Sequence, residues 1–460
     1  MIDFAHPYIP NSDTTIQKKI LQEIGARDIE ALFAEIPEAI RFRGTMDLPE
    51  PLLSECSLNN KLMQIINKNK TTSDHLSFLG GGCYNHYVPA VCDEINSRSE
   101  FLTGYAGEPF EDHGRFQALF EYASLLGELL DMDMVSIPTY DGSQAAASSL
   151  RMAARITHRK KILVPDILSW DKKAIIENYT TGILDLEYVK NDPATGKIDM
   201  DDLASNLSKE VAAVYMEMPS FAGIIDEGAK DIGQLAHDHG ALFVVGVDPS
   251  SLGIISPPIH YGADIVCGDL QPLGLHLACG GNLAGFIASS DDEKFVSEYP
   301  TRLFGIESTT EPGEYGFGDV TFDRTSFGAR ENGKEFIGTA AALNGITAGV
   351  YLSLMGPQGM KDLGTTIFNN TDYLKHRLSK INGIKILFKA SASFKEVCVQ
   401  FNTISVDKIN KKLLAQGIFG SVDISGKFMK IQNAAMFCTT EIHTKKDIDR
   451  LCQALESIID

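Results

Sequence analysis

The chain has 460 residues, of which 44% are hydrophobic and 22% charged, a composition typical of a globular protein with more than one domain. Lys and Arg number 41 and Asp and Glu 61, so the formal net charge of -20 argues against partners such as nucleic acid or an anionic membrane. No apolar run is long enough to span a membrane and the N-terminus lacks a secretory pattern, so we expect a cytoplasmic protein. Eight cysteines without a CxxC pair favour buried thiols over disulfides or a metal site.

Residues 1–75 are predicted to form a helical arm. Ser12 and Asp13 are alternative N-caps for a helix that reaches about Ile24, and Asp28 starts a second helix before several prolines interrupt the pattern. No cluster of titratable side chains indicates chemistry in this arm. We therefore expect it to pack on its own domain or on a neighbouring chain.

Two segments between residues 78 and 113 are candidates for a site. The first, FLGGGCYNHY at 78–87, lacks the spacing of a phosphate-binding loop and is expected to allow close backbone packing. The second is a loop rich in aromatic and acidic residues, where four side chains fall close together: Tyr105, Glu108, Glu111 and His113. They are either solvated loop residues or the wall of a pocket beside a reactive centre.

Apolar residues spaced by three and four positions predict a helix from Gly114 to Leu130, and another helix begins within TYDGSQAA, residues 139–146. A Gly-Ser pair at a helix N-terminus offers free N–H groups and the positive end of the helix dipole, which predicts an anion site. Helix capping by Asp141 or Ser143 is the alternative.

Residues 161–247 alternate between strands and helices. The expected strands are 161–164, 184–189, 212–216 and 241–247, and the expected helices are 172–179, 200–208 and 231–239. Continuous apolar runs in these strands predict a doubly wound, mainly parallel α/β sheet. Sites in such sheets lie at the carboxyl ends of the strands, where Glu217 and Asp248 share one rim. Asp248 is placed either to hold a pyridinium nitrogen or to cap the next turn.

The segment GADIVCGDLQPLGLHLACGGNLAG, residues 262–285, follows the next strand. In α/β enzymes that carry pyridoxal phosphate, a strand end in this region presents the lysine that binds the cofactor covalently. The chain has no lysine between Lys230 and Lys294. This loop therefore cannot attach the cofactor.

The remainder predicts a small α+β domain. Helices are expected at 340–354, ended by Gly356-Pro357, and at 362–381, 406–416 and 445–459, with strands at 385–388, 396–401, 428–431 and 434–438. The predicted domains are the arm at 1–75, a large α/β domain at 76–335 and a C-terminal α+β domain at 336–460.

Several motifs in matching order resemble those of one family. They are LGGGCYNHYVPA at 79–90, SRSEFLTGY at 97–105, DPSSLG at 248–253, YGADIV at 261–266 and QPLG at 271–274. The resemblance is to subunit 1, the alpha chain, of the two-subunit glycine dehydrogenase (decarboxylating), the P-protein of the glycine cleavage system. It implies pyridoxal-phosphate fold type I and a beta-type partner that carries the lysine and the cofactor, because the beta chain's His-Lys pair falls on Gln271-Pro272 here.

The resemblance further implies an α2β2 enzyme that decarboxylates glycine and passes the aminomethyl group to a lipoyl carrier (H) protein. The wall of the partner's catalytic site would then come from Tyr105, Glu108, Glu111 and His113 of this chain. The chain's own remnant of a cofactor pocket would consist of Tyr140, Asp141, Ser143, Asp248 and Gln271, with Pro272 at the lysine position. We expect no covalently bound cofactor and no metal on this chain, and no activity of the chain alone.

The chain departs from the family pattern at three loops: residues 106–114, residues 332–341, and Ser169-Trp170, where a His-Pro pair is expected. These are places where the family builds its site or its subunit contact. Two alternatives therefore stay open. One is a divergent paralogue that acts with a beta-like partner on another amino acid or carrier, and the other is a non-catalytic scaffold homologue.

Overall fold

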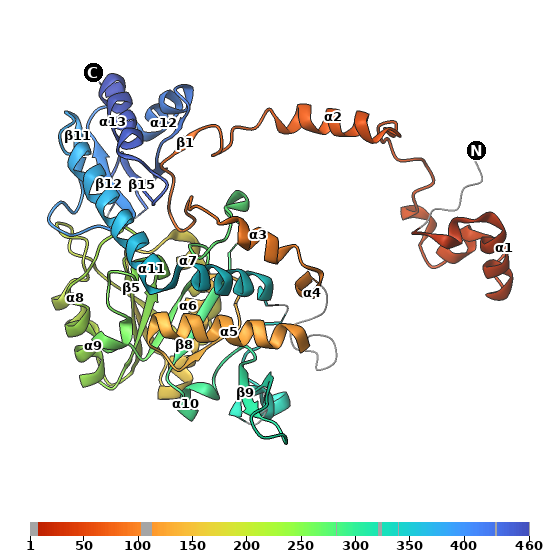
Figure 1. The fold of residues 1–460 in the computed structure, drawn as a ribbon, viewed down its shortest axis with the longest axis horizontal. Helices are drawn as coiled ribbons and strands as arrows, with labels where there is room; N and C mark the ends of the chain where they lie inside the picture. Colours follow the sequence, from red (N-terminus) through yellow and green to blue (C-terminus); the bar gives the residue numbers. More distant parts are fainter. Residues whose placement is uncertain are drawn as a thin grey trace. The chain divides into compact units, whose positions relative to one another are not determined.

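The computed structural model describes residues 8–102, 113–281, 283–320, 324–338, 340–427 and 430–459. The chain divides into two compact units, residues 1–69 and 70–460. Elements of the first unit are η1 (Pro10–Ser12), α1 (Thr14–Glu23), η2 (Ile29–Phe33), η3 (Glu38–Ile40) and α2 (Glu55–Ile66) (Figure 1). Asp13 is the N-cap of α1, because its carboxylate accepts the N–H groups of Thr15 and Ile16.

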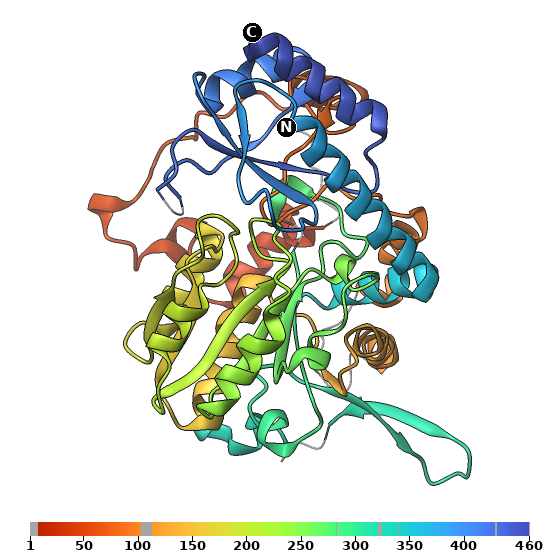
Figure 2. The same cartoon turned by 90° about the vertical axis from the view of Figure 1, so that its left-hand side faces the viewer.

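A seven-stranded sheet lies at the centre of the second unit (Figure 2). Its strands, in chain order, are β2 (Met134–Val135), β3 (Lys161–Pro165), β4 (Asp185–Val189), β5 (Val211–Met218), β6 (Leu242–Val247), β7 (Ile265–Asp269) and β8 (Gly285–Ser289). The spatial order is β2-β8-β7-β6-β5-β3-β4; β3 to β7 are parallel, whereas β8 is antiparallel to β7 and to β2. The prediction of a mainly parallel α/β sheet is confirmed.

Helices cover both faces of this sheet. α6 (Gly142–Thr157), α7 (Trp170–Thr180) and α10 (Glu293–Val296) bury their apolar side chains in one layer with β3, β5 and β7. The opposite layer holds α5 (His113–Leu130), α8 (Met200–Asn206), α9 (Ala229–Asp238) and residues from both halves of α11 (Ala342–Leu378). α3 (Ala90–Asn96) and α4 (Ser99–Leu102) precede α5. Because strand residues alternate between the two layers, the continuous apolar runs seen in the sequence are buried on both sides.

The C-terminal domain contains a four-stranded antiparallel sheet in the order β11-β12-β15-β14. Its elements are β11 (Ile384–Ile386), β12 (Glu396–Phe401), α12 (Val406–Ala415), β13 (Ile418–Phe419), β14 (Val422–Asp423), β15 (Ala434–Cys438) and α13 (Lys445–Ile459). β1 (Leu76–Ser77) pairs in parallel with β13, so the chain enters this domain before it builds the large one. The strand predicted at 428–431 is not formed at its described residues, 430 and 431.

The two helices predicted between residues 340 and 381 are formed as two helical segments of α11 (Ala342–Leu378), which meet at the non-helical residue Gly356. Gly356 adopts φ +57° and ψ -178° and kinks α11, but Pro357 follows at once in helical conformation. Proline is favoured at the first position of a helix because the N–H it lacks would have no partner there. The prediction that the first helix ends at Gly356-Pro357 is therefore confirmed, although the second helical segment starts at Pro357 and not at residue 362.

A hairpin of β9 (Phe304–Ser308) and β10 (Tyr315–Asp319) projects from the large domain (Figure 2). Its base is held to α5 by two aromatic pairs, Phe116 with Phe304 and Phe120 with Phe317, whose ring centroids lie 4.8 and 5.4 Å apart. Among the described residues, no helix has both the length and the apolar character needed to cross a bilayer.

Candidate functional site

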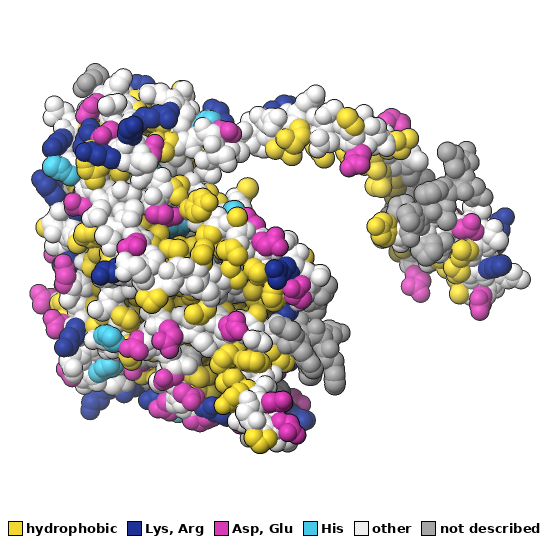
Figure 3. Space-filling view, in the orientation of Figure 1, with side chains coloured by type: hydrophobic (Ala, Val, Ile, Leu, Met, Phe, Trp, Pro, Cys, Tyr) yellow, Lys and Arg dark blue, Asp and Glu magenta, His cyan; other side chains and the backbone are white. Residues whose placement is uncertain are grey.

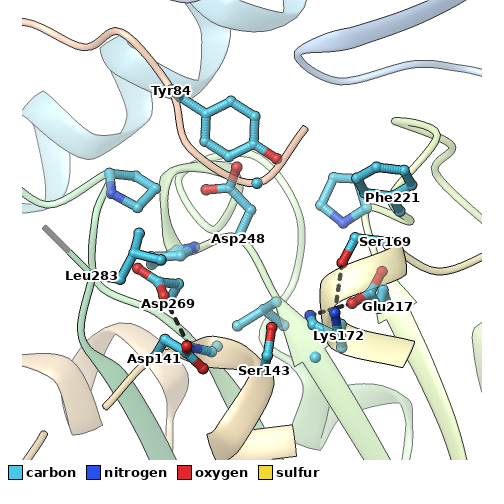
Figure 4. A pocket seen from close by; sticks show the side chains of 18 of the residues that line it. Tyr84, Asp141, Ser143, Ser169, Lys172, Glu217, Phe221, Asp248, Asp269 and Leu283 are labelled. Carbon is cyan, nitrogen blue, oxygen red and sulfur yellow. Dashed lines mark hydrogen bonds and ion pairs between the residues drawn. The ribbon is translucent and has the colours of Figure 1, made fainter. Parts of the chain in front are cut away.

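A cavity of about 110 Å³ lies at the carboxyl ends of β5, β6 and β7 (Figure 4). Its walls come from the first turns of α6 and α7, the glycine-rich segment after β1, and the loop after β5. The polar side chains that line it are Tyr84, Asp141, Ser143, Ser169, Asp171, Lys172, Glu217, Ser220, Asp248 and Asp269. This is the rim at which the sequence predicted a site.

The N-terminus of α6 forms one wall, and carboxylates of the chain itself occupy it. Asp141 caps the helix by accepting the N–H of Gln144 at 2.7 Å. Asp269, at the end of β7, accepts the N–H of Gly142 at 2.8 Å and that of Gln271 at 2.8 Å. Burial raises the pKa of Asp269 to about 7, despite these hydrogen bonds. Of the two readings of this helix start, capping is the one that the contacts support.

A second charged pair lies at the start of α7. Lys172 forms an ion pair with Glu217 at the end of β5, and the Tyr215 hydroxyl donates to the same carboxylate at 3.2 Å. Burial opposes the charge of Lys172, but Glu217 raises the pKa of this lysine above its usual value. Lys172 is therefore held as a cation, and a protonated amine is not a nucleophile.

The third pair joins the large domain to the C-terminal domain. Lys395 Nζ lies 2.5 Å from Asp248 Oδ2, and the lysine side chain is only 1% exposed. The ammonium also lies 4.1 Å from the ring centroid of Tyr84, a cation–π contact. Burial would raise the pKa of Asp248, but Lys395 and the Ser250 hydroxyl lower it below its usual value, so this carboxyl group is ionised.

The glycine-rich segment, residues 78–87, lies over this part of the cavity. Figure 4 shows its Tyr84 above Asp248. Gln271 exchanges two hydrogen bonds with the backbone of Tyr84, at 3.0 and 2.8 Å. Gly81 donates its N–H to Glu396 at 3.2 Å, and a Cβ on Gly80 would lie 2.6 Å from the Cβ of Cys438. The close backbone packing expected of these glycines is confirmed.

A histidine–glutamate pair, His86 and Glu441, fixes the C-terminal end of the glycine-rich segment. His86 Nδ1 and the Tyr87 N–H both contact Glu441 at 2.7 Å. Although burial opposes it, the charge of His86 and these hydrogen bonds lower the pKa of Glu441 to about 2. Burial and the nearby charge of Lys395 lower the pKa of His86, whereas Glu441 opposes this shift.

The structure brings some of the predicted site residues together and separates others. Asp141, Ser143, Asp248 and Pro272 line the cavity. Tyr140 does not; it is half exposed, and its hydroxyl donates to the carbonyl of Gly338 at 3.0 Å. Gln271 is buried beside the cavity, where it positions Tyr84. The roles of these residues toward a ligand stay predictions.

The predicted wall of the partner's site falls on residues that the structure leaves undescribed. Tyr105, Glu108 and Glu111 lie outside the described residues, and His113 is described only as the first backbone position of α5. Their catalytic role stays a prediction.

Sequence reasoning missed Lys172, Asp269 and Lys395 as members of the site. The loop after β7 holds no lysine, but Lys172, which lines the cavity, comes from α7, and Lys395, which contacts Asp248 of the cavity wall, comes from the C-terminal domain. One signal was present: Lys395 and Glu396 place two charges directly before the apolar strand VCVQF. Charged side chains are rarely buried without partners, so this pattern indicates a buried ion pair.

These contacts do not fit a phosphorylated pyridine cofactor. Pro272 offers no amine, Asp248 already binds an ammonium group, and two N–H groups of the α6 N-terminus are taken by carboxylates. Asp141 and Asp269 would also repel a phosphate at that position. Within the described ranges, no cluster of His, Cys, Asp and Glu side chains is arranged to hold a metal ion.

The sheet order, the helix layers and the small C-terminal sheet define pyridoxal-phosphate fold type I. A NifS-like protein from Rickettsia africae shares this architecture, with a TM-score of 0.63 at 13% identity over 84% of this chain and 99% of that one. A sphingosine-1-phosphate lyase from Burkholderia pseudomallei gives 0.64 at 12% identity, over 92% and 94% of the two chains. Identities this low support the fold alone.

Sequence comparison identifies the family. The model for the glycine cleavage system P-protein matches residues 6–455, and the chain belongs to this family. Proteins named "Probable glycine dehydrogenase (decarboxylating) subunit 1" are 38% identical in Staphylothermus marinus and 37% identical in Thermococcus onnurineus, over at least 98% of both chains. A crystal structure of glycine decarboxylase (P-protein) in inhibitor-bound form has a TM-score of 0.85 at 30% identity, covering 97% of this chain and 98% of that one. The resemblance seen in the sequence is confirmed.

Proposed function

We propose that this chain is the lysine-lacking, alpha-type subunit of a pyridoxal-phosphate glycine decarboxylase. It acts with a lysine-bearing beta-type subunit, as α2β2, and the pair passes the aminomethyl group of glycine to a lipoyl carrier protein. One observation carries this proposal: a member of the P-protein family keeps the fold type I cavity, yet has proline at the lysine position and pairs the cavity's charges internally. The name "subunit 1" in its relatives also implies a second subunit.

The roles of the two subunits follow from the charged residues in and beside the cavity of this chain. Pyridoxal phosphate on the partner would supply the electron sink that decarboxylation requires. Lys172 and Lys395 of this chain are held in ion pairs with Glu217 and Asp248, so neither offers a free amine nucleophile. This chain would therefore contribute shape and exclusion of water at the partner's site, and we expect it to be inactive alone.

An apolar face on the second unit is suited to such a partner. Hydrophobic side chains gather over the region of α3, α5 and α11 (Figure 3), and exposed residues on these and adjoining elements include Tyr87, Val91, Leu102 and Leu354. Patches of this kind on a water-soluble surface mark protein contacts, and obligate interfaces are apolar at their centre. The face is consistent with a stable subunit contact.

Reconstitution with the partner tests the proposal. The tagged chain should retain a lysine-bearing P-protein subunit encoded in the same genome, and the pair should exchange carbon dioxide with the carboxyl group of glycine when lipoyl carrier protein is added. Either chain alone should show less than about 1% of the pair's rate, because neither holds a complete site. A partner variant with its cofactor lysine changed to alanine is the matched control.

The alternatives predict other outcomes. Turnover of a different amino acid, with none of glycine, would indicate the divergent paralogue. A chain that retains no lysine-bearing partner would indicate the scaffold homologue, and either result would contradict the proposal.

A further inference from the structure

We propose that Lys395 and Asp269 occupy the places of the two charged ends of a phosphorylated pyridine cofactor, so that this chain's own side chains close its cavity to pyridoxal and pyridoxamine phosphates. The inference goes beyond the proposed function, because it holds whatever substrate the partner uses. It also goes beyond the missing lysine, since loss of a covalent link alone would still leave a pocket able to bind the cofactor through its charges.

The first replacement is at the ring-nitrogen end. A buried aspartate at this rim pairs with a pyridinium nitrogen in enzymes that use this cofactor. Here the partner of Asp248 is the Lys395 ammonium, at 2.5 Å, under the ring of Tyr84. One cation per buried carboxylate satisfies the charge, so a second cation, the pyridinium, has no counter-ion left to bind.

The backbone around Lys395 holds the ammonium in this place. The Lys395 N–H donates to Thr371 at 3.0 Å, and its carbonyl accepts the N–H of Thr439 at 2.9 Å. Next to it, Gly223 of the large domain adopts φ +78°, and a Cβ there would lie 2.4 Å from the Glu396 carbonyl oxygen. The loop after β5 thus packs against the start of β12 with no room for a side chain, and Lys395 cannot swing out without parting the two domains.

The second replacement is at the phosphate end. A phosphate binds a helix N-terminus through free N–H groups and the helix dipole. At α6 the Asp269 carboxylate accepts the N–H of Gly142 at 2.8 Å, and a Cβ added to Gly142 would lie 3.0 Å from the Asp269 Cβ. The carboxyl oxygen of Asp269 therefore takes the N–H group that a phosphate would use, and the Asp269 side chain fills the space in front of the first turn.

A titration with pyridoxamine 5′-phosphate, which has no aldehyde to react with surface lysines, tests both replacements on the full chain. The single tryptophan of the chain, Trp170, packs edge-on against Phe221 of the cavity wall, with centroids 5.8 Å apart, and its fluorescence reports occupancy. Equilibrium dialysis gives the same constant independently. The wild-type chain should show no saturable binding below about 1 mM, and Lys395→Ala/Asp269→Ser should bind at least tenfold more tightly, a gain of about 1.4 kcal/mol.

Asp269→Ser alone keeps the Lys395–Asp248 pair and is expected to fold, so it decides the matter even if the double variant does not fold. It should bind inorganic phosphate at least tenfold more tightly than the wild type, because the N–H of Gly142 becomes free. Asp269→Asn is the matched control: its amide oxygen still accepts that N–H, so phosphate binding should stay as weak as in the wild type. Saturable wild-type binding of pyridoxamine phosphate below about 0.1 mM, or an Asp269→Ser variant no better than wild type, would overturn the proposal.

Discussion

The variant Lys395→Met is expected to lose about 3–5 kcal/mol of its free energy of unfolding, because it leaves the Asp248 carboxylate buried without its cation. Methionine is similar in length and apolar, so packing near Tyr84 changes little and the loss reports mainly the unpaired charge. Denaturant unfolding of the full chain at pH 7, followed by circular dichroism, measures it.

Two further variants separate this cause from a general effect of losing a lysine. Lys385, on β11 of the same domain, is exposed, and Lys385→Met should change stability by less than about 0.5 kcal/mol. Lys395→Met/Asp248→Asn should recover more than half of the loss, because no charge remains to be paired. A loss below about 1 kcal/mol in Lys395→Met would show that solvent or another group satisfies Asp248.

Stability is expected to fall by about 1–2 kcal/mol as the pH rises from 6.5 to 8. Burial raises the pKa of Glu396 to about 8 and that of Asp269 to about 7, whereas both groups titrate near pH 4 when unfolded. A folded-state pKa above the unfolded value gives stability that is fully present below about pH 4 and is lost as the pH passes the folded pKa. The measurement is the free energy of unfolding at several pH values.

Other titratable groups change the stability outside the range from pH 6.5 to 8, or change it in the opposite direction. Asp248 and Glu441, whose pKa values are lowered, lose their contribution only in acid. Burial lowers the pKa values of His86 and His443, and they act in the opposite direction below about pH 6.5. Glu396→Gln keeps an acceptor for the Gly81 N–H and should remove more than half of the decline. An unchanged slope in that variant would assign the pH dependence elsewhere.

The elements that the sequence predicted best are those whose periodicity and burial agree. β12, β15 and α13 have the predicted bounds, because a continuous apolar run or a helical apolar stripe stops where turn residues begin. The two helical segments of α11 were predicted because Gly356-Pro357 marks a helix boundary, but local sequence did not show that the second segment starts directly at Pro357. The hairpin β9–β10 was not predicted from its glycine-rich, acidic sequence, since its aromatic residues are ordered by tertiary contacts with α5.

The residues of the site also divide into those that the sequence predicted and those that it did not. Asp141, Ser143 and Asp248 were predictable because the rim of a parallel sheet follows from strand order alone. Lys395 was not, because it reaches Asp248 across 147 residues and from another domain. Asp269 was not recognised either, since its carboxylate acts on the N-terminus of a helix more than a hundred residues earlier. The Lys395 contact depends on how the C-terminal domain packs on the large one, and the Asp269 contact on how α6 packs across the end of β7; local pattern encodes neither.

Borohydride trapping of the reconstituted pair tests the central claim most directly, namely that this chain is the subunit without the cofactor lysine. The pair is incubated with pyridoxal phosphate, reduced, digested and analysed by mass spectrometry of each chain. We predict pyridoxyl-lysine on the partner at one residue and none at Lys172 or Lys395 of this chain, because these two lysines are held in ion pairs and position 272 is proline. Stoichiometric pyridoxyl-lysine at Lys172 or Lys395, with the partner unlabelled, would contradict the account.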